Sequence, residues 1–184
     1  MQWIIGFIIT FVIVLAYISL YNGLVEALSW VREAWIQVEV QLEKRNVLVP
    51  KLIETIKDYT KQEHEAFTQV VQLRNKLQQF PVENRLEKMH VSNQLSESIK
   101  TVFALSESYS NLKNNENFKE LQEELATTEN KLAYSRQLYN SSVTSYNIKL
   151  QALPSNLIAK LHGFKEIELL ETPPEDRIIP KISF

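Results

Sequence analysis

The chain has 184 residues, of which 45% are hydrophobic and 23% charged, and this is enough for one domain with a buried core. Its formal net charge of −2 argues against a nucleic-acid binder, and the absence of cysteine excludes a disulfide scaffold and Cys-ligated zinc or iron–sulfur sites. All 20 basic and 22 acidic side chains lie at or beyond Glu26, so the first 25 residues carry no side-chain charge.

This uncharged start predicts a membrane-spanning helix. The 18 residues from Trp3 to Leu20 are almost wholly aliphatic and aromatic, and a helix of that length, about 27 Å, is close to the roughly 30 Å hydrocarbon core of a bilayer. Trp3 at one end and Tyr17 and Tyr21 at the other suit the two interfacial aromatic belts. A cleaved signal peptide is the alternative, but the segment lacks a basic n-region and a small-x-small cleavage site. We therefore expect residues 1–23 to form a retained, single-pass anchor.

The flanking charges indicate an orientation for this anchor. Trp3 is preceded by no charged side chain, whereas Arg32 follows the span at close range and Lys44 and Arg45 follow further on. The positive-inside rule then favours an N-terminus outside the cell and a cytoplasmic remainder.

The rest of the sequence predicts helix. Between Gly23 and Gly163 there is no glycine, and only Pro50, Pro81 and Pro154 interrupt a sequence rich in good helix formers. We expect an all-α fold: a single N-terminal transmembrane helix, then an antiparallel bundle of three long helices plus a short C-terminal helix. The expected ranges are a bundle over 24–164, with helices at 24–78, 82–109, 117–151 and 155–162, a loop at 110–115 and an extended tail at 165–184.

The prediction of the first of these helices depends on a seven-residue apolar repeat. Apolar side chains recur in steps of three and four, the seam typical of a coiled coil, at Leu28, Val31, Trp35, Val38, Leu42, Val49, Leu52, Ile56, Tyr59, Ala66, Val70, Leu73 and Leu77. The repeat keeps its phase through Pro50, where a turn would normally reset it. Because a long packed helix can absorb the cost of one proline, about 3 kcal/mol, we expect one helix of about 80 Å, bent at Pro50 and continuous with the anchor.

The shorter signals concern the later helices. Thr128, Ser135 and Ser142 lie seven residues apart on the seam of the third long helix, which favours close helix approach over catalytic hydroxyls. Ser155 is the expected N-cap of the short helix, and Gly163 is its expected stop.

The predicted helix lengths leave part of the first seam without a partner. Helices of about 40 and 52 Å cannot both cover an 80 Å helix along its whole length. The membrane-proximal residues Trp30, Val31, Trp35 and Val38 are therefore a candidate interface for self-association or for a membrane-protein partner.

Two charged residues fall on the same seam. Arg45 and Glu63 are about 27 Å apart along one helix, too far to pair with each other. Because an unpaired buried charge is strongly unfavourable, each needs a partner from another helix, with Glu129 and Arg136 as candidates. We interpret them as polar layers that fix register, or as wet edge positions.

Sequence motifs for chemistry are sparse. His64, His90 and His162 lie far apart, and Glu87 with His90 forms only one Glu-x-x-His half-site, whereas a di-iron bundle needs two. Three isolated glycines cannot form a phosphate-binding loop. We therefore expect no metal, no cofactor, no small-molecule substrate and no catalytic activity.

The C-terminal tail ends in Ile182-x-Phe184, a hydrophobic-x-hydrophobic pattern that a PDZ groove can bind by strand addition. The alternative, which we favour, is that the tail packs onto its own bundle, as terminal segments commonly do.

Many short matches along the chain make it resemble the bacterial LemA family. They are Tyr21-Asn22-Gly23-Leu24-Val25, Glu33-Ala34-Trp35, Leu48-Val49-Pro50-Lys51-Leu52-Ile53-Glu54, Asn115-Glu116-Asn117-Phe118, Leu121-Gln122-Glu123-Glu124-Leu125, Glu129-Asn130-Lys131-Leu132-Ala133-Tyr134-Ser135-Arg136, Tyr139-Asn140, Tyr146-Asn147, Gly163-Phe164 and Pro180-Lys181-Ile182-Ser183-Phe184. The resemblance implies an anchored bacterial inner-membrane protein with a helical bundle and without an established catalytic activity. Ser155, Lys160 and His162 depart from the pattern, which concerns only the packing of the short helix.

These features favour a structural or interaction protein, a helical rod that organises a membrane assembly and contacts the lipid bilayer and a membrane-protein partner or further copies of itself. An adaptor or regulator of a membrane protease is the alternative, because genes of the family often neighbour those of such proteases. An enzyme with an unrecognised site is a third and weaker reading.

Overall fold

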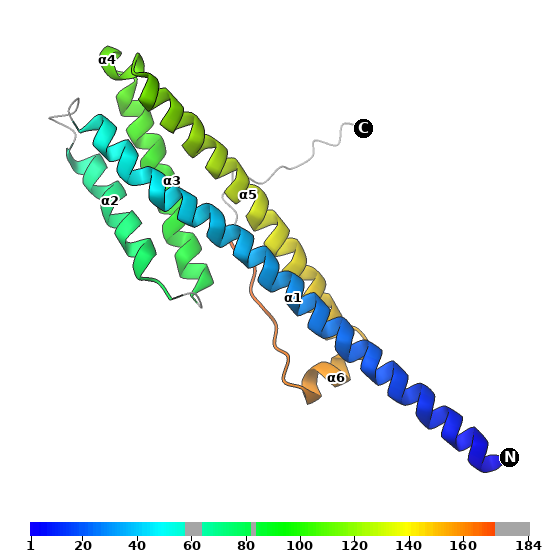
Figure 1. Ribbon diagram of the computed structural model, residues 1–184. Helices are drawn as coiled ribbons and strands as arrows, with labels where there is room; N and C mark the ends of the chain where they lie inside the picture. The colour runs from blue at the N-terminus through cyan, green and yellow to red at the C-terminus, as the bar shows by residue number, and fades with distance from the viewer. Residues whose placement is uncertain (58–63, 82–83, 172–184) are drawn as a thin grey trace, which may run out of the picture. The chain divides into compact units, whose positions relative to one another are not determined.

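The computed structural model describes residues 1–57, 64–81 and 84–171, and every regular element in these ranges is an α-helix (Figure 1). The elements are α1 (Gln2–Ile56), α2 (His64–Gln79), α3 (Arg85–Ser106), α4 (Ser110–Lys113), α5 (Glu116–Gln151) and α6 (Ser155–Leu161). The predicted all-α fold with one long apolar N-terminal helix is therefore confirmed.

Helix α1 runs without interruption from the apolar start of the chain to Ile56, with Pro50 inside it. The continuity predicted between the apolar segment and the first bundle helix is present, and Pro50 does not form a turn. A proline in a helix removes one backbone hydrogen bond, a loss that packing of the surrounding side chains can offset. Leu48, Val49 and Leu52, which flank Pro50, are all buried.

The single helix predicted over 24–78 is wrong beyond Ile56. Helix α2 starts at His64 and runs back antiparallel to α1 (Figure 1), and Arg74 Nε donates a hydrogen bond of 2.8 Å to Asn46 Oδ1. The repeat did not reveal this reversal because residues 57–63 separate the two helices by one heptad, so that the apolar spacing resumes in phase. That connection contains neither glycine nor proline, and the predicted seam position Glu63 lies outside the described residues.

By contacts, the described residues divide into two compact units, one made of residues 1–36 and 137–169 and the other of the described residues from 37 to 136 together with 170–171. The second unit holds the main apolar cluster, with Phe103 and Phe118 in an edge-to-face contact at 6.0 Å. The buried members come from α1, α2, α3, α4 and α5: Leu48, Val49, Leu52, Ile56, Val70, Leu95, Ile99, Val102, Leu112, Phe118 and Leu125. Leu112 belongs to α4, so the loop predicted over 110–115 contains one turn of helix that contributes to the core.

In the first unit, α5 runs antiparallel to α1. Lys149 Nζ donates a 3.2 Å hydrogen bond to the carbonyl of Gly23, and the rings of Trp35 and Tyr139 meet at 5.7 Å. Helices α1 and α5 therefore run in opposite directions, as predicted for an antiparallel bundle.

The small hydroxyl residues on the seam of α5 donate hydrogen bonds to backbone carbonyls of the same helix. Thr128 and Ser135 are buried, and their hydroxyls donate to the carbonyls of Glu124 and Lys131 at 2.7 and 2.9 Å. This use of the hydroxyls agrees with a packing role.

Helix α6 stops at Gly163, as predicted. Gly163 has φ +71°, its N–H donates to Lys160, and the N–H of Phe164 donates to Ala159, a Schellman arrangement that requires the left-handed conformation. The predicted cap is wrong: Pro154 is the N-cap, and Ser155, the first helical residue, donates its hydroxyl to the carbonyls of Lys149 and Ala152.

After α6 the chain is extended and lies along α5. The Asn147 side chain donates to the carbonyl of Ile167 at 2.8 Å and accepts from its N–H at 3.1 Å. The Tyr146 hydroxyl donates to the carbonyl of Lys165 at 3.0 Å, and Gln151 donates to Glu166 at 2.8 Å. Burial raises the pKa of Tyr146, although the charge of Arg32 acts in the opposite direction, so the phenol stays a hydrogen-bond donor at neutral pH.

Candidate functional site

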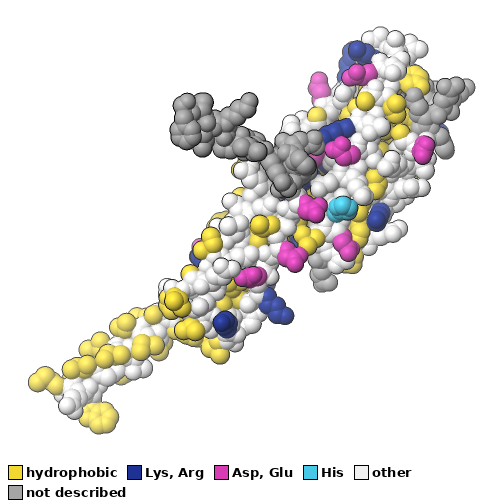
Figure 2. Space-filling model, turned by 180° about the vertical axis from the view of Figure 1, so that it is seen from behind, with side chains coloured by type: hydrophobic (Ala, Val, Ile, Leu, Met, Phe, Trp, Pro, Cys, Tyr) yellow, Lys and Arg dark blue, Asp and Glu magenta, His cyan; other side chains and the backbone are white. Residues whose placement is uncertain are grey.

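The apolar N-terminal part of α1 is the most distinctive surface of the molecule. Its best 18-residue window has a mean hydropathy of 2.6 and is 0% buried, and among the described residues α1 is the one helix long and apolar enough to cross a membrane. Figure 2 shows hydrophobic side chains covering this segment. Exposed large apolar side chains run through the predicted span from Trp3, which is 92% exposed, to Ile18, which is 47% exposed.

The predicted interface farther along α1 is mostly internal. Val31, Trp35 and Val38 are 0–2% exposed, so these three residues are not an exposed stripe, and that part of the prediction is wrong. The length argument failed because α1 ends at Ile56: its part beyond residue 23 is 33 residues, about 50 Å, which the 36 residues of α5, about 54 Å, can match. Trp30 is 57% exposed and stays a candidate contact residue.

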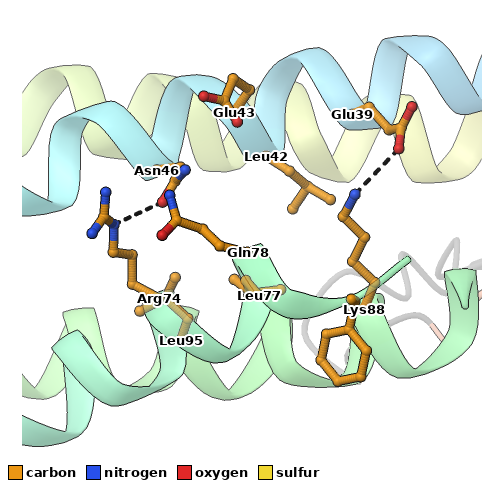
Figure 3. A pocket seen from close by; sticks show the side chains of 10 residues that line it. Glu39, Leu42, Glu43, Asn46, Arg74, Leu77, Gln78, Lys88 and Leu95 are labelled. Carbon is orange, nitrogen blue, oxygen red and sulfur yellow. Dashed lines mark hydrogen bonds and ion pairs between the residues drawn. The ribbon is translucent and has the colours of Figure 1, made fainter. Parts of the chain in front are cut away.

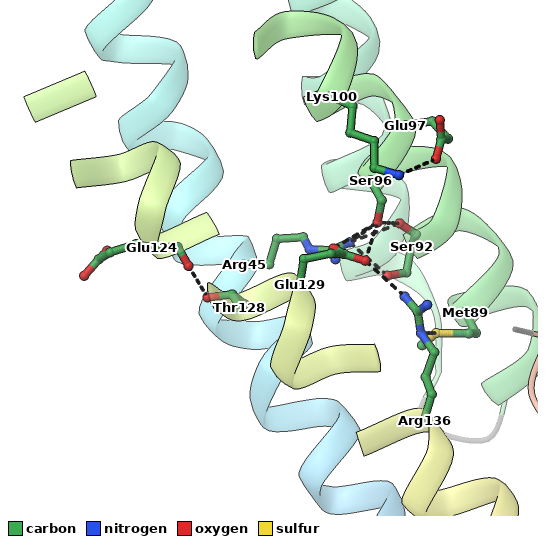
Figure 4. Close-up of polar contacts among 10 residues, drawn as sticks. All are labelled: Arg45, Met89, Ser92, Ser96, Glu97, Lys100, Glu124, Thr128, Glu129 and Arg136. Carbon is green, nitrogen blue, oxygen red and sulfur yellow. Dashed lines mark hydrogen bonds and ion pairs between the residues drawn. The ribbon is translucent and has the colours of Figure 1, made fainter. Parts of the chain in front are cut away.

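A buried polar layer occupies the middle of the second unit (Figure 4). Arg45, 2% exposed, forms an ion pair with Glu129 of α5 and donates from Nη1 to the carbonyl and hydroxyl of Ser92 and to the hydroxyl of Ser96, at 3.0–3.1 Å. The pairing of Arg45 with Glu129, one of the two predicted partners, is confirmed.

Arg136 completes this layer. Its Nη2 atom lies 3.6 Å from Glu129 Oε1, and its Nε donates to the sulfur of the fully buried Met89 at 2.9 Å. Glu129 therefore faces two guanidinium groups, and the Ser96 hydroxyl lies 3.1 Å from both of its carboxylate oxygens.

Burial, and secondarily the charge of Arg136, lower the pKa of Arg45 to about 9. Arg45 thus keeps its proton at neutral pH, and the layer is an ion cluster closed by hydrogen bonds. Such a cluster favours one register of α1 against α5, because sliding either helix by one turn would separate Arg45 from Glu129, and Ser92 and Ser96 tie α3 to the same layer by hydrogen bonds.

A hollow of about 440 Å³ opens between α1, α2 and the start of α3 (Figure 3). Two contacts join side chains that line it: Lys88 Nζ lies 3.2 Å from Glu39 Oε1, and Arg74 donates to Asn46. Sequence reasoning missed this hollow because it depends on the reversal of α2.

The two histidines whose side chains the structure describes, His90 and His162, contact different residues. His90 Nδ1 lies 3.6 Å from a carboxylate oxygen of Glu171, and Glu87 instead accepts from Asn84 at 3.4 Å. Within the described part of the chain, no three His, Asp or Glu side chains are grouped to hold a metal ion. The side chain of His64 and the tail residues Ile182 and Phe184 lie outside the described residues.

A ring cluster next to the apolar segment was also missed. The Tyr17 hydroxyl and His162 Nε2 lie 2.6 Å apart in a hydrogen bond, and the rings of Tyr21 and His162 are 4.7 Å apart, with Phe164 at 6.0 Å from Tyr21. Tyr17 and His162 are 145 residues apart in the sequence, and no local spacing signals such a contact.

The LemA family model matches residues 34–184, which is most of the chain. The chain belongs to the LemA family. The matched region contains the polar layer and α6, and the apolar start of α1 precedes it.

Two curated relatives of this LemA-family chain come from Paramagnetospirillum magneticum, the magnetosome proteins MamQ 1 and MamQ 2. Each is 29% identical over 73 residues, which cover 40% of this chain and 27% of the relative. The chain thus matches about a quarter of the length of these relatives.

Proposed function

We propose that this LemA-family protein is a membrane-anchored structural or interaction protein that helps to organise a bacterial membrane assembly. The observation that carries the proposal is α1 itself: one helix begins with an unburied apolar segment of membrane-spanning length and continues, without a hinge loop, into the buried seam of the bundle. An anchor joined in this way ties the first helix of the bundle directly to the bilayer.

The side chains of the bundle support a structural role. Glu129 faces both Arg45 and Arg136, and Lys88 is paired with Glu39 at the hollow. A substrate would have to break these pairs before it could use them. The proposal therefore includes no catalytic activity.

The curated relatives and the flanking charges bear on where the protein acts. The names of both curated relatives contain the word magnetosome, and this supports a role in a membrane-associated assembly for the present chain. We place the protein in a bacterial inner membrane with its N-terminus outside and its bundle in the cytoplasm, an orientation favoured by Arg32 and the uncharged N-terminus.

Crosslinking in native membranes tests the proposal. A photoreactive residue at the exposed Trp30 should give reproducible crosslinks to a second copy or to one membrane protein, whereas the same residue at the exposed Lys119 of α5 is the matched control. Mass spectrometry identifies the products. A protein that is removed from membranes by carbonate, or that crosslinks to nothing from either position, would contradict the proposal.

The tail offers a second candidate function, an adaptor for a membrane protease through Ile182 and Phe184. Deleting residues 178–184 separates the alternatives. Loss of a protease from pull-downs at unchanged thermal stability supports the adaptor, and a lower unfolding temperature at unchanged binding supports a tail that packs on its own bundle.

A further inference from the structure

Helix α6 exposes an apolar face. Leu157 and Leu161, one turn apart, are 64% and 73% exposed, and Leu153 just before the helix is 80% exposed. The other face is buried through Ile158 and Ala159. A short helix that is anchored by one face and presents leucines on the other is typical of an interaction surface.

Contacts at the end of α6 fix its position relative to the apolar segment of α1. His162 is hydrogen-bonded to Tyr17, in the last turn of the predicted span, and packs against Tyr21, one residue beyond it. Tyrosines at the end of a transmembrane helix lie at the level of the lipid headgroups. Residues tied to both rings lie at that same level.

The charges around α6 suit an anionic surface. Between residues 137 and 165 the Lys and Arg residues are Lys149, Lys160 and Lys165, and the first acidic residue, Glu166, follows in the extended segment, where it accepts a hydrogen bond from Gln151. Lys160 is exposed and lies between Leu157 and Leu161 in the sequence. Leucines interspersed with lysines are the composition of helices that lie in the interface of a membrane with anionic lipids.

We propose that α6 is a second membrane contact, in which Leu153, Leu157 and Leu161 insert into the interfacial region of the leaflet at the C-terminal end of the apolar segment and Lys160 binds anionic phospholipid headgroups. This inference rests on the proposed membrane anchoring and adds a lipid-binding surface outside the span. His162 is a positioning residue, because it holds α6 against Tyr17 and Tyr21.

The chain contains no cysteine, so single-cysteine variants can be labelled without background. An environment-sensitive fluorophore is attached to the full-length variants Leu157→Cys and Leu161→Cys in nanodiscs of phosphatidylcholine and phosphatidylglycerol. Bromine on the upper acyl chains should quench both labels several-fold more than the matched label at Lys119→Cys, an exposed position on α5. Both labels should also emit at shorter wavelength than the control.

Two outcomes would overturn the inference, and one further label tests the anchor separately. Labels at 157 and 161 that are quenched by aqueous iodide as strongly as the label at 119 overturn the inference. Protection of the labels from iodide that appears only when two copies share a nanodisc, with energy transfer between their labels, also overturns it in favour of a protein–protein contact. A label at Val12→Cys separates the two proposals: if bromine quenches it while 157 and 161 stay in water, the anchor stands and α6 does not bind lipid.

Discussion

The ion cluster around Arg45 shows how one residue can restrict helix packing. A charge on an apolar seam must find a partner when the seam is buried, and Arg45 finds Glu129, Ser92 and Ser96. The sequence could predict this pairing because the repeat identified the seam position and the cost of burying a charge required a partner on another helix. It could not predict Ser92 and Ser96, because hydroxyls on a helix carry no partner signal of their own.

Glu129→Gln should destabilise the bundle. The change leaves Arg45 and Arg136 without their shared carboxylate, and we expect a loss of roughly 2–3 kcal/mol in the free energy of unfolding, below the roughly 3–5 kcal/mol of fully buried pairs because Glu129 keeps 31% exposure. Urea unfolding of the full chain in detergent micelles measures it. Glu123→Gln, on the exposed side of α5, should change the value by less than about 0.5 kcal/mol. Equal effects of the two substitutions would show that the cluster contributes nothing to the free energy of unfolding.

The two tryptophans of α1 beyond the apolar segment, Trp30 and Trp35, should also differ in their contribution to stability. Trp35 is 2% exposed and packs edge to face on Tyr139, whereas Trp30 is 57% exposed. We expect Trp35→Ala to cost about 3–5 kcal/mol through the cavity it leaves, and Trp30→Ala to cost less than about 0.5 kcal/mol in the isolated protein. Urea unfolding of the full chain in detergent micelles measures both costs. A large cost at Trp30 alone would reinstate the interface predicted from the sequence and contradict the burial of Trp35.

At the scale of the elements, α2 is the main difference between expectation and structure. Apolar periodicity reports which face of a segment is buried, and it does not report direction; a seven-residue connection leaves the phase unchanged. Pro50 was the strongest local signal, yet the chain turns after Ile56, where the sequence has neither glycine nor proline. Long-range contacts such as that of Arg74 with Asn46 decide the reversal.

Distance measurements distinguish the hairpin from a straight helix. Residues 43 and 78 would lie about 52 Å apart in a continuous helix, whereas both line the same hollow in the structure. Spin labels at Glu43→Cys and Gln78→Cys should therefore give a distribution below about half that value. Labels at Lys119→Cys and Lys131→Cys, about 18 Å apart along α5, calibrate the spread expected within one helix. A distribution centred near 50 Å would contradict the hairpin.

At the scale of the whole molecule, the sequence predicted the fold class and the family correctly because both depend on features spread along the chain. The uncharged start, the scarcity of glycine and the LemA-like matches each involve many residues, so single errors do not change them. The candidate site was predicted less well. Trp30 is exposed as predicted, and Arg45 is paired with Glu129, one of its predicted partners. Val31, Trp35 and Val38 were wrongly assigned to the surface, because the helix lengths used in that argument assumed one helix over 24–78.

The orientation of the whole chain can be tested with the same cysteine-free background. We expect Gln2→Cys to react with a membrane-impermeant maleimide in intact cells and Lys119→Cys to react only after the cells are opened, because the positive-inside rule leaves the N-terminus outside. Denaturing gels show the mass shift of each variant. Labelling of Lys119→Cys in intact cells would reverse the topology without affecting the fold.

The amide of Asn147 gives the segment after α6 a mechanical property. Because Asn147 both donates to and accepts from Ile167, a side chain takes the place that a neighbouring β-strand usually has. A force applied to the chain beyond Glu171 is resisted first by the contact of Glu171 with His90 and by the buried Leu170, and then by the separate side-chain bonds of Asn147, Tyr146 and Gln151, which can break one after another. The extended segment can therefore peel from α5 in small steps under tension, well before the helices themselves are loaded.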